Sequence, residues 1–227
     1  MYVVAQEQPQ ARAEFIRKTY LHLAGAVAAF IAIETVLVQS GIAATLARAL
    51  TGGMTWLAVL GGFSLLGWFS RGLASRADSV SLQYLGLGIY VVAEALLFAP
   101  LIYIASSMSD PTVIPTAGIL TSFMFVGLTA VALTTGKDFS FLGGALKIGG
   151  FVALGLIVCS VLFQFQLGLF FSVLMVGFAM AAILYDTSQI VNNFTKDQYV
   201  AAALSLFSSV ALLFWYVLRI VMSMSRR

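Results

Sequence analysis

Long apolar stretches separated by short polar connections make up almost all of the 227 residues. A helix needs about 20 apolar residues to cross the hydrocarbon core of a bilayer. Seven stretches approach or exceed this length and predict seven transmembrane helices, over residues 20–39, 53–70, 82–106, 112–135, 147–165, 168–190 and 199–222. The connections leave no room for a separate soluble domain. The pattern therefore predicts an all-α, polytopic membrane protein folded as one bundle.

The predicted organisation has three parts. Residues 1–19 form an N-terminal tail, residues 20–222 form the seven-helix bundle, and residues 223–227 form a short basic C-terminus. The last apolar stretch allows either a full crossing or a re-entrant segment that returns to the side from which it came. Its length favours a full crossing.

The basic residues predict the orientation, because Lys and Arg concentrate on the cytoplasmic side of a membrane. With the N-terminus inside, the inner side holds Arg12, Arg17, Lys18, Arg71, Arg76, Lys137, Lys147 and Lys196, and the outer connections hold only Arg48. A full crossing by the last stretch puts Arg219, Arg226 and Arg227 outside, against this rule. The first six helices nevertheless predict a cytoplasmic N-terminus.

The composition supports the membrane assignment and excludes several functions. Hydrophobic residues make up 61% of the chain and charged residues only 9%, whereas soluble domains carry about 25% charged residues. One histidine, His22, and one cysteine, Cys159, exclude a multi-histidine metal site and an intrachain disulfide. The chain has no Gly-rich phosphate loop, His-Glu-x-x-His or Gly-x-Ser-x-Gly motif. We therefore expect no enzyme activity, no tightly bound cofactor and no nucleic-acid partner, with the lipid bilayer as the main environment.

Three acids lie inside or at the edge of apolar stretches: Glu34, Glu94 and Asp186. A charged side chain in hydrocarbon costs roughly 2.5–3.5 kcal/mol on insertion scales, so such residues face the bundle interior or a wet cavity and mark ion routes. Glu94 is the deepest, and Pro100 after it breaks the hydrogen-bond ladder and frees a carbonyl. Glu94 is thus a candidate to line an ion pathway. The alternative is a protonated side chain that hydrogen-bonds a neighbouring helix.

The other candidates lie nearer the helix ends. Glu34 is near the outer end of the first helix, which favours snorkelling or a packing role. His22 lies one turn into the same helix and is able to titrate near neutral pH, although a hydrogen-bonded interfacial histidine explains it equally well. Asp186 ends an apolar stretch and is either a solvated helix end or an inward-facing group. Arg71, on the same side of the membrane, is its candidate ion-pair partner.

Small residues recur in pairs that permit close helix packing. These pairs are Gly25 and Ala29, Gly61 and Gly62, and Gly149 and Gly150. We expect helix–helix contacts at these positions.

Several stretches resemble the BAX inhibitor-1 family, also called transmembrane BAX inhibitor motif proteins. "ALTTGKDFSFLGGAL" (132–146) resembles the segment after its fourth helix, and "ILYDTSQIV" (183–191) resembles its sixth-helix signature. "EALLFAPLI" (94–102) and "FIRKTYLHLAGAV" (15–27) resemble its third-helix motif and the entry to its first helix. The resemblance extends from about residue 12 to residue 222.

The resemblance implies a seven-helix bundle with the last helix packed centrally, and a pH-sensitive calcium leak across the membrane. In the mechanism inferred for the family, one aspartate on the sixth helix and one on the seventh share a proton and close the pore, and an arginine of the second helix acts as a latch. Asp186 matches the first aspartate and Arg71 is a match for the latch. Ser209 stands at the position of the second aspartate. A serine can donate to a carboxylate but cannot share a proton between like charges, so sensing by a carboxylate pair is not expected.

Two functions follow from these observations. The first is a pH-influenced calcium (cation) leak channel of a bacterial inner membrane, with Asp186 as gate and weak Ca²⁺ ligand and Glu94 along the pathway. Ser209 and Asn192 supply further oxygens, since calcium takes several hard oxygen ligands. The alternative is a non-conducting modulator of a membrane-bound AAA protease, as the resemblance implies for some bacterial members, or of a complex related to stress or cell death. The sequence leaves the oligomeric state open, and a monomer is plausible.

Overall fold

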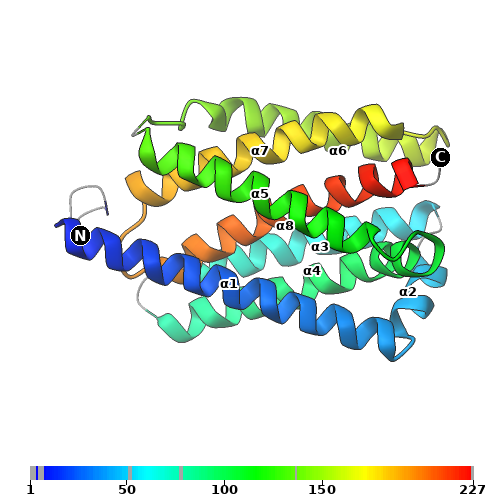
Figure 1. Ribbon diagram of the computed structural model, residues 1–227, viewed down its shortest axis with the longest axis horizontal. Coiled ribbons are helices and arrows are strands. Elements are labelled where there is room, and N and C mark those ends of the chain that lie inside the picture. The colour runs from blue at the N-terminus through cyan, green and yellow to red at the C-terminus, as the bar shows by residue number, and fades with distance from the viewer. Residues whose placement is uncertain (1–3, 5–7, 51–52, 77–78, 136, 226–227) are drawn as a thin grey trace.

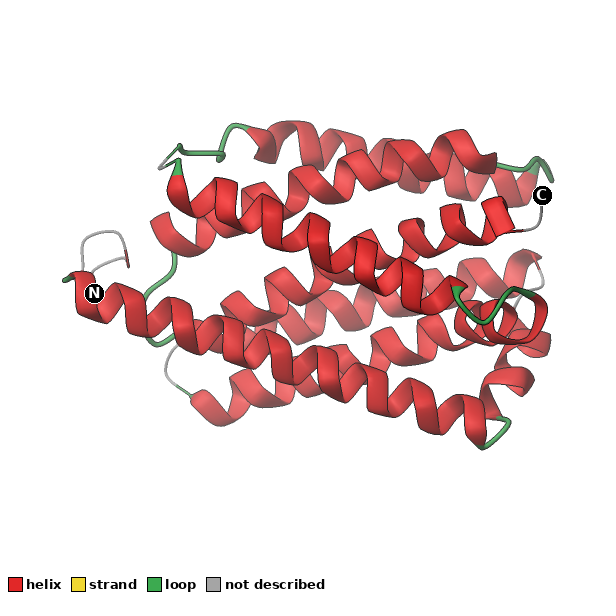
Figure 2. Cartoon of the chain, in the orientation of Figure 1, coloured by secondary structure: helices red, strands yellow, loops and turns green. Residues whose placement is uncertain are grey.

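Helices make up nearly all of the described structure. The computed structural model describes residues 4, 8–50, 53–76, 79–135 and 137–225, and it contains no strand within them (Figure 2). The helices are α1 (Pro9–Gln39), α2 (Ile42–Leu50), α3 (Gly53–Ala74), α4 (Val80–Met108), α5 (Val113–Thr134), α6 (Leu142–Leu162), α7 (Gly168–Asn192) and α8 (Tyr199–Ser225). All except α2 are long and apolar enough to cross a membrane. The prediction of an all-α, polytopic membrane protein with seven transmembrane helices is confirmed.

The helix boundaries differ from the apolar stretches at several ends. Helix α1 begins at Pro9, well before residue 20. Proline is favoured in the first turn, where its missing N–H costs no hydrogen bond. Helix α2 was not predicted, because its nine residues are too few to span a bilayer. Much of the predicted tail is therefore helical.

Helix α8 is one continuous helix of 27 residues, which excludes the re-entrant alternative. It includes residues 223–225 of the predicted C-terminal segment, whereas Arg226 and Arg227 lie outside the described residues. It runs through the middle of the bundle (Figure 1) and contacts α1, α3, α4, α5 and α7. Buried side chains occur along its whole length, from Val200 to Met222. The last helix is thus packed centrally, as predicted.

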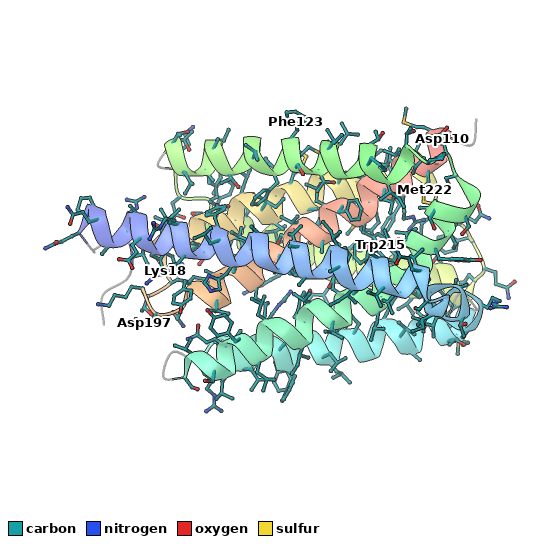
Figure 3. The ribbon with its side chains drawn as sticks, turned by 60° about the horizontal axis from the view of Figure 1, so that its bottom comes forward. Lys18, Asp110, Phe123, Asp197, Trp215 and Met222 are labelled. Carbon is teal, nitrogen blue, oxygen red and sulfur yellow. The ribbon has the colours of Figure 1, made fainter. Side chains whose placement is uncertain are left out.

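The two ends of the bundle carry different connections. Lys18 and Asp197 lie at the end where α1 begins, and Asp110 and Met222 lie at the opposite end (Figure 3). We call these the N-terminal end and the distal end. The connections α3–α4, α5–α6 and α7–α8 are at the N-terminal end, together with the start of α1 (Figure 1). The carboxyl end of α7 and the amino end of α8 therefore meet there.

Helices α3 and α4 are in close backbone contact at Gly86. A Cβ atom on Gly86 would lie 2.5 Å from the carbonyl oxygen of Ser70 and 2.8 Å from the backbone nitrogen of Ala74. Only glycine fits this contact. Ser70 directly precedes Arg71, so this contact sets where Arg71 enters the bundle.

The small-residue pairs singled out in the sequence are only partly packing sites. A Cβ atom on Gly149 would lie 3.1 Å from the ring of Phe178 on α7. A Cβ atom on Gly25, Gly61 or Gly62 would meet nothing within 4 Å. The expectation of close helix contacts at those three glycines is wrong.

Candidate functional site

Asp186 faces the bundle interior and is hydrogen-bonded to α8. The Ser205 hydroxyl donates to its Oδ1 over 3.0 Å, and the Ser209 hydroxyl donates to its Oδ2. Ser205 and Ser209 are four residues apart and so lie on one face of α8. Asp186 is therefore an inward-facing group and not a solvated helix end. We call these three residues the carboxylate site.

Arg71 lies next to this site but does not form a salt bridge with Asp186. Its Nη2 donates to the Ser208 hydroxyl oxygen over 2.8 Å, and its guanidinium lies 5.8 Å from the centre of the Tyr90 ring. The Tyr90 hydroxyl also donates to Ser208, over 3.0 Å. Among the described residues the single salt bridge is Lys18–Glu14, so the predicted ion pair is wrong. Arg71 remains close enough to Asp186 for its charge to act on that group.

Glu94 is buried deep in α4, with 5% of its surface exposed. Its Oε2 has no hydrogen-bond partner in the described structure, and its carboxyl group lies beside Tyr90 and within reach of the Arg71 charge. Helix α4 continues through Pro100 without interruption. Glu94 thus has one buried carboxylate oxygen to which no described group donates a hydrogen bond.

Asp186 and Glu94 line the same cavity. Its volume is about 890 Å³ and its walls come from α3, α4, α6, α7, α8 and the α6–α7 connection. Binding pockets for small molecules typically measure about 300–1,000 Å³. The cavity extends from Arg71, near the N-terminal end, to Arg219, near the distal end. Its polar residues are Ser64, Arg71, Tyr90, Glu94, Lys147, Ser160, Gln166, Tyr185, Asp186, Ser205, Ser208, Ser209, Tyr216 and Arg219.

The carboxylate site supplies few ligands for a metal ion. Calcium takes six to eight oxygen ligands, whereas the site offers one carboxylate and the hydroxyls of Ser205 and Ser209. No group of three or more His, Cys, Asp or Glu side chains suited to a metal occurs in the part of the chain that the structure describes. The donor set suits a transient cation better than a resident one.

Three further candidates from the sequence, Glu34, Asn192 and His22, do not line this cavity. Glu34 is 6% exposed, and neither carboxylate oxygen has a hydrogen-bond partner among the described residues. Glu34 is thus packed inside the protein and does not snorkel. Asn192 donates to the Ser188 hydroxyl over 3.3 Å and is not among the residues that contact Asp186.

His22 is a hydrogen-bonded histidine between α1 and α4. Its Nδ1 lies 2.7 Å from the carbonyl oxygen of Lys18, which can only accept, so Nδ1 carries a proton. Its Nε2 lies 2.6 Å from the Tyr84 hydroxyl. Its ring also lies 5.0 Å from that of Tyr199, measured between centroids. These contacts favour the structural interpretation of His22 over an ion-pathway role.

Sequence reasoning missed a polar network that ties the α5–α6 connection to α7. The Asp138 carboxylate accepts from the Ser140 backbone N–H over 2.9 Å and from the Ser188 hydroxyl over 3.0 Å. The hydrogen bonds from Ser140 and then Ser188 hold the pKa of Asp138 below its usual value. Gln189 donates to the Ser140 hydroxyl over 2.9 Å. An aspartate in a connection is a known turn signal, because its side chain accepts from the backbone N–H two residues on. This signal could have identified Asp138.

The sequence is similar to a protein family and to several known proteins. The family profile described as "Inhibitor of apoptosis-promoting Bax1" matches residues 12–227. Protein LIFEGUARD 4 of Arabidopsis thaliana is 31% identical over 230 residues, which cover 97% of this chain and 89% of that protein.

Two bacterial proteins match over shorter stretches. An uncharacterised protein of Pseudomonas aeruginosa is 42% identical over 110 residues, 48% of this chain and 49% of that protein. "Modulator of FtsH protease YccA" of Escherichia coli is 34% identical over 125 residues, 55% of this chain and 56% of that protein. The matched stretches thus span about half the length of these two relatives. The family profile covers nearly the whole chain, and the chain belongs to the BAX inhibitor-1 family.

Proposed function

We propose that the protein is a pH-influenced cation leak channel, with calcium as the transported ion, in a bacterial inner membrane with its N-terminus in the cytoplasm. The observation that carries this proposal is the cavity itself, which brings the carboxylates of Asp186 and Glu94 together inside a membrane bundle. Intramembrane acids that face a cavity mark ion pathways.

In this proposal the carboxylate site is the gate. Ser205 and Ser209 on α8 hold the end of α7 through the two oxygens of Asp186. A cation that binds these oxygens competes with the serine hydroxyl protons and loosens the α7–α8 contact. A proton on Asp186 removes the charge that attracts the cation, which makes the flux depend on pH. Glu94 offers the next carboxylate along the cavity.

Calcium flux into liposomes that contain the purified protein tests this proposal. We expect flux with the wild type, a different flux with Asp186→Asn, and a reduced flux with Glu94→Gln. Asp197→Asn is the matched control, because Asp197 lies at the same end of the bundle and does not line the cavity. Equal flux in the wild type, Asp186→Asn and Glu94→Gln contradicts the proposal.

The similarity to an Escherichia coli protein named "Modulator of FtsH protease YccA" favours a second candidate. Here the protein binds a membrane-bound AAA protease and conducts no ions. The N-terminal tail then matters more than Asp186. Helix α1 begins at Pro9, so deletion of residues 1–8 leaves every helix intact. It also removes the buried side chain of Val4 and its backbone hydrogen bond to Phe194, so the folding of this variant is checked first.

Co-purification with a membrane-bound AAA protease, and the rate at which that protease degrades a membrane substrate, test this candidate. A modulator is expected to lose its effect on the rate when residues 1–8 are deleted, while liposome flux stays unchanged. Loss of flux in a folded tail-deletion variant argues against the acid-lined leak. Retention of the full effect on the protease argues against a tail-mediated contact.

A further inference from the structure

The residues that α3 and α6 contribute to the cavity include exposed ones, from which we infer that the cavity opens to the outer surface of the bundle between these helices. Ser64 and Arg71 on α3 line it and are exposed, as are Lys147 and Leu154 on α6. Leu154 has 49% of its surface exposed. In a bilayer this surface faces lipid, so an acyl chain is able to reach the cavity from the side.

The wall beyond this opening has the chemistry of an acyl-chain site. Its side chains from α3, α4 and α6 are mainly aliphatic or aromatic and include Leu60, Phe63, Leu97, Leu154 and Ile157. Gly150 lies on the same wall, and a Cβ atom on it would be 3.8 Å from its nearest neighbour outside its own helix. An extended hydrocarbon chain gains from burial against such a surface.

Two cations stand at the N-terminal end of this opening. Arg71 lies three residues before the end of α3 and Lys147 lies five residues after the start of α6. At 1.5 Å per residue they are about 5 Å and about 8 Å from the helix ends. With the helix ends at the membrane surface, this depth corresponds to the headgroup region. Neither forms a salt bridge within the described residues. The hydrogen bond to Ser208 uses one of the five N–H donors of Arg71, which leaves others for a phosphate.

We propose that this cavity binds one anionic phospholipid, whose phosphate is held by Arg71 and Lys147 and whose acyl chain enters between α3 and α6. The charge of the two cations selects an anionic headgroup over a zwitterionic one. This binding does not depend on ion conduction. If the proposed leak is correct, the bound chain excludes water from the polar wall and opposes the flux, a consequence that rests on the proposed function.

The proposal is tested by adding lipid to the delipidated protein in detergent. Native mass spectrometry then measures how much of the added lipid the protein retains. The probes are phosphatidylglycerol and phosphatidylcholine with identical acyl chains. We expect one phosphatidylglycerol to be retained at concentrations where phosphatidylcholine is not. Lys147→Gln is expected to weaken this retention about tenfold, as loss of one charge-assisted contact implies. Lys137→Gln is the matched control, because Lys137 is exposed at the same end but does not line the cavity.

A second pair of variants tests the position of the acyl chain. Leu154→Trp fills the opening, whereas Val152→Trp adds the same bulk to an exposed position of α6 outside the cavity. Leu154→Trp should reduce retention of phosphatidylglycerol and Val152→Trp should not. Equal retention of the two lipids, an equal loss in Lys137→Gln and Lys147→Gln, or full retention in Leu154→Trp overturns the proposal. Because the readout is lipid mass, its failure is separate from a failure of the flux experiment.

Discussion

We expect Gly86→Ala to push α3 and α4 apart. The added Cβ atom would lie 2.5 Å from the carbonyl oxygen of Ser70 and 2.8 Å from the backbone nitrogen of Ala74. Both neighbours are backbone atoms of α3, so no side-chain rotation relieves the clash. The helices must separate, and Arg71 moves with Ser70.

The loss of stability caused by Gly86→Ala is obtained by comparing this variant with Gly88→Ala. A Cβ atom on Gly88 meets nothing within 4 Å. Both substitutions gain the same helix propensity, about 1 kcal/mol relative to glycine, so this gain cancels in the difference. The remaining overpacking term is about 1–3 kcal/mol. Gly86→Ala should therefore be less stable than Gly88→Ala by that amount.

Thermal unfolding in detergent, followed by far-UV circular dichroism, measures this difference. Gly88→Ala should melt at or slightly above the wild-type temperature, and Gly86→Ala should melt below it. Equal melting temperatures for the two variants would refute the close approach of α3 and α4 at Gly86, and with it the packing argument for the position of Arg71.

Three further outcomes test other contacts. Ser209→Ala removes one of the two hydrogen bonds to Asp186 and should cost about 0.6–1.7 kcal/mol in unfolding measurements. When Ser209→Ala is made in the Asp186→Leu variant, it should cost nothing, because the hydrogen bond is already absent. Asp138→Asn should lower the melting temperature at pH 7: the lowered pKa of Asp138 in the folded protein means that its charge stabilises the fold above about pH 3.9. The difference in melting temperature between Asp138→Asn and the wild type should shrink as the pH falls through the lowered pKa of Asp138. Glu34→Leu removes a buried carboxyl group that has no hydrogen-bond partner among the described residues and should stabilise the protein by about 1–3 kcal/mol, whereas destabilisation would reveal a partner for Glu34.

The sequence predicted the number and type of the transmembrane helices, because lipid requires long apolar segments with internally satisfied backbones. Helix α2 was not predicted in this way, because it has only nine residues. The glycine contacts were predicted poorly, because spacing does not reveal which face of a helix meets a neighbour. Gly86 packs against α3, whereas Gly25 has open space beside it.

The sequence predicted the acidic residues of the candidate site but not the side chains that contact them. Asp186 and Glu94 stood out because charges are costly in apolar stretches. The serines that bind Asp186 come from another helix, and Arg71 reaches Ser208 across 137 residues of chain. Such pairings depend on how helices are rotated against one another. The spacing of Ser205 and Ser209 by four residues was the one local signal for a shared polar face.

The pH dependence of calcium flux tests the central claim, that Asp186 gates a cation pathway, most directly. Purified wild-type protein, Asp186→Asn and Asp197→Asn are reconstituted in liposomes, and flux is followed from pH 5 to pH 8 with a calcium-sensitive dye. We expect the flux to change with pH in the wild type and in Asp197→Asn, and we expect no response of the flux to pH in Asp186→Asn. An unchanged pH response in Asp186→Asn, or no flux above protein-free liposomes, would contradict the claim.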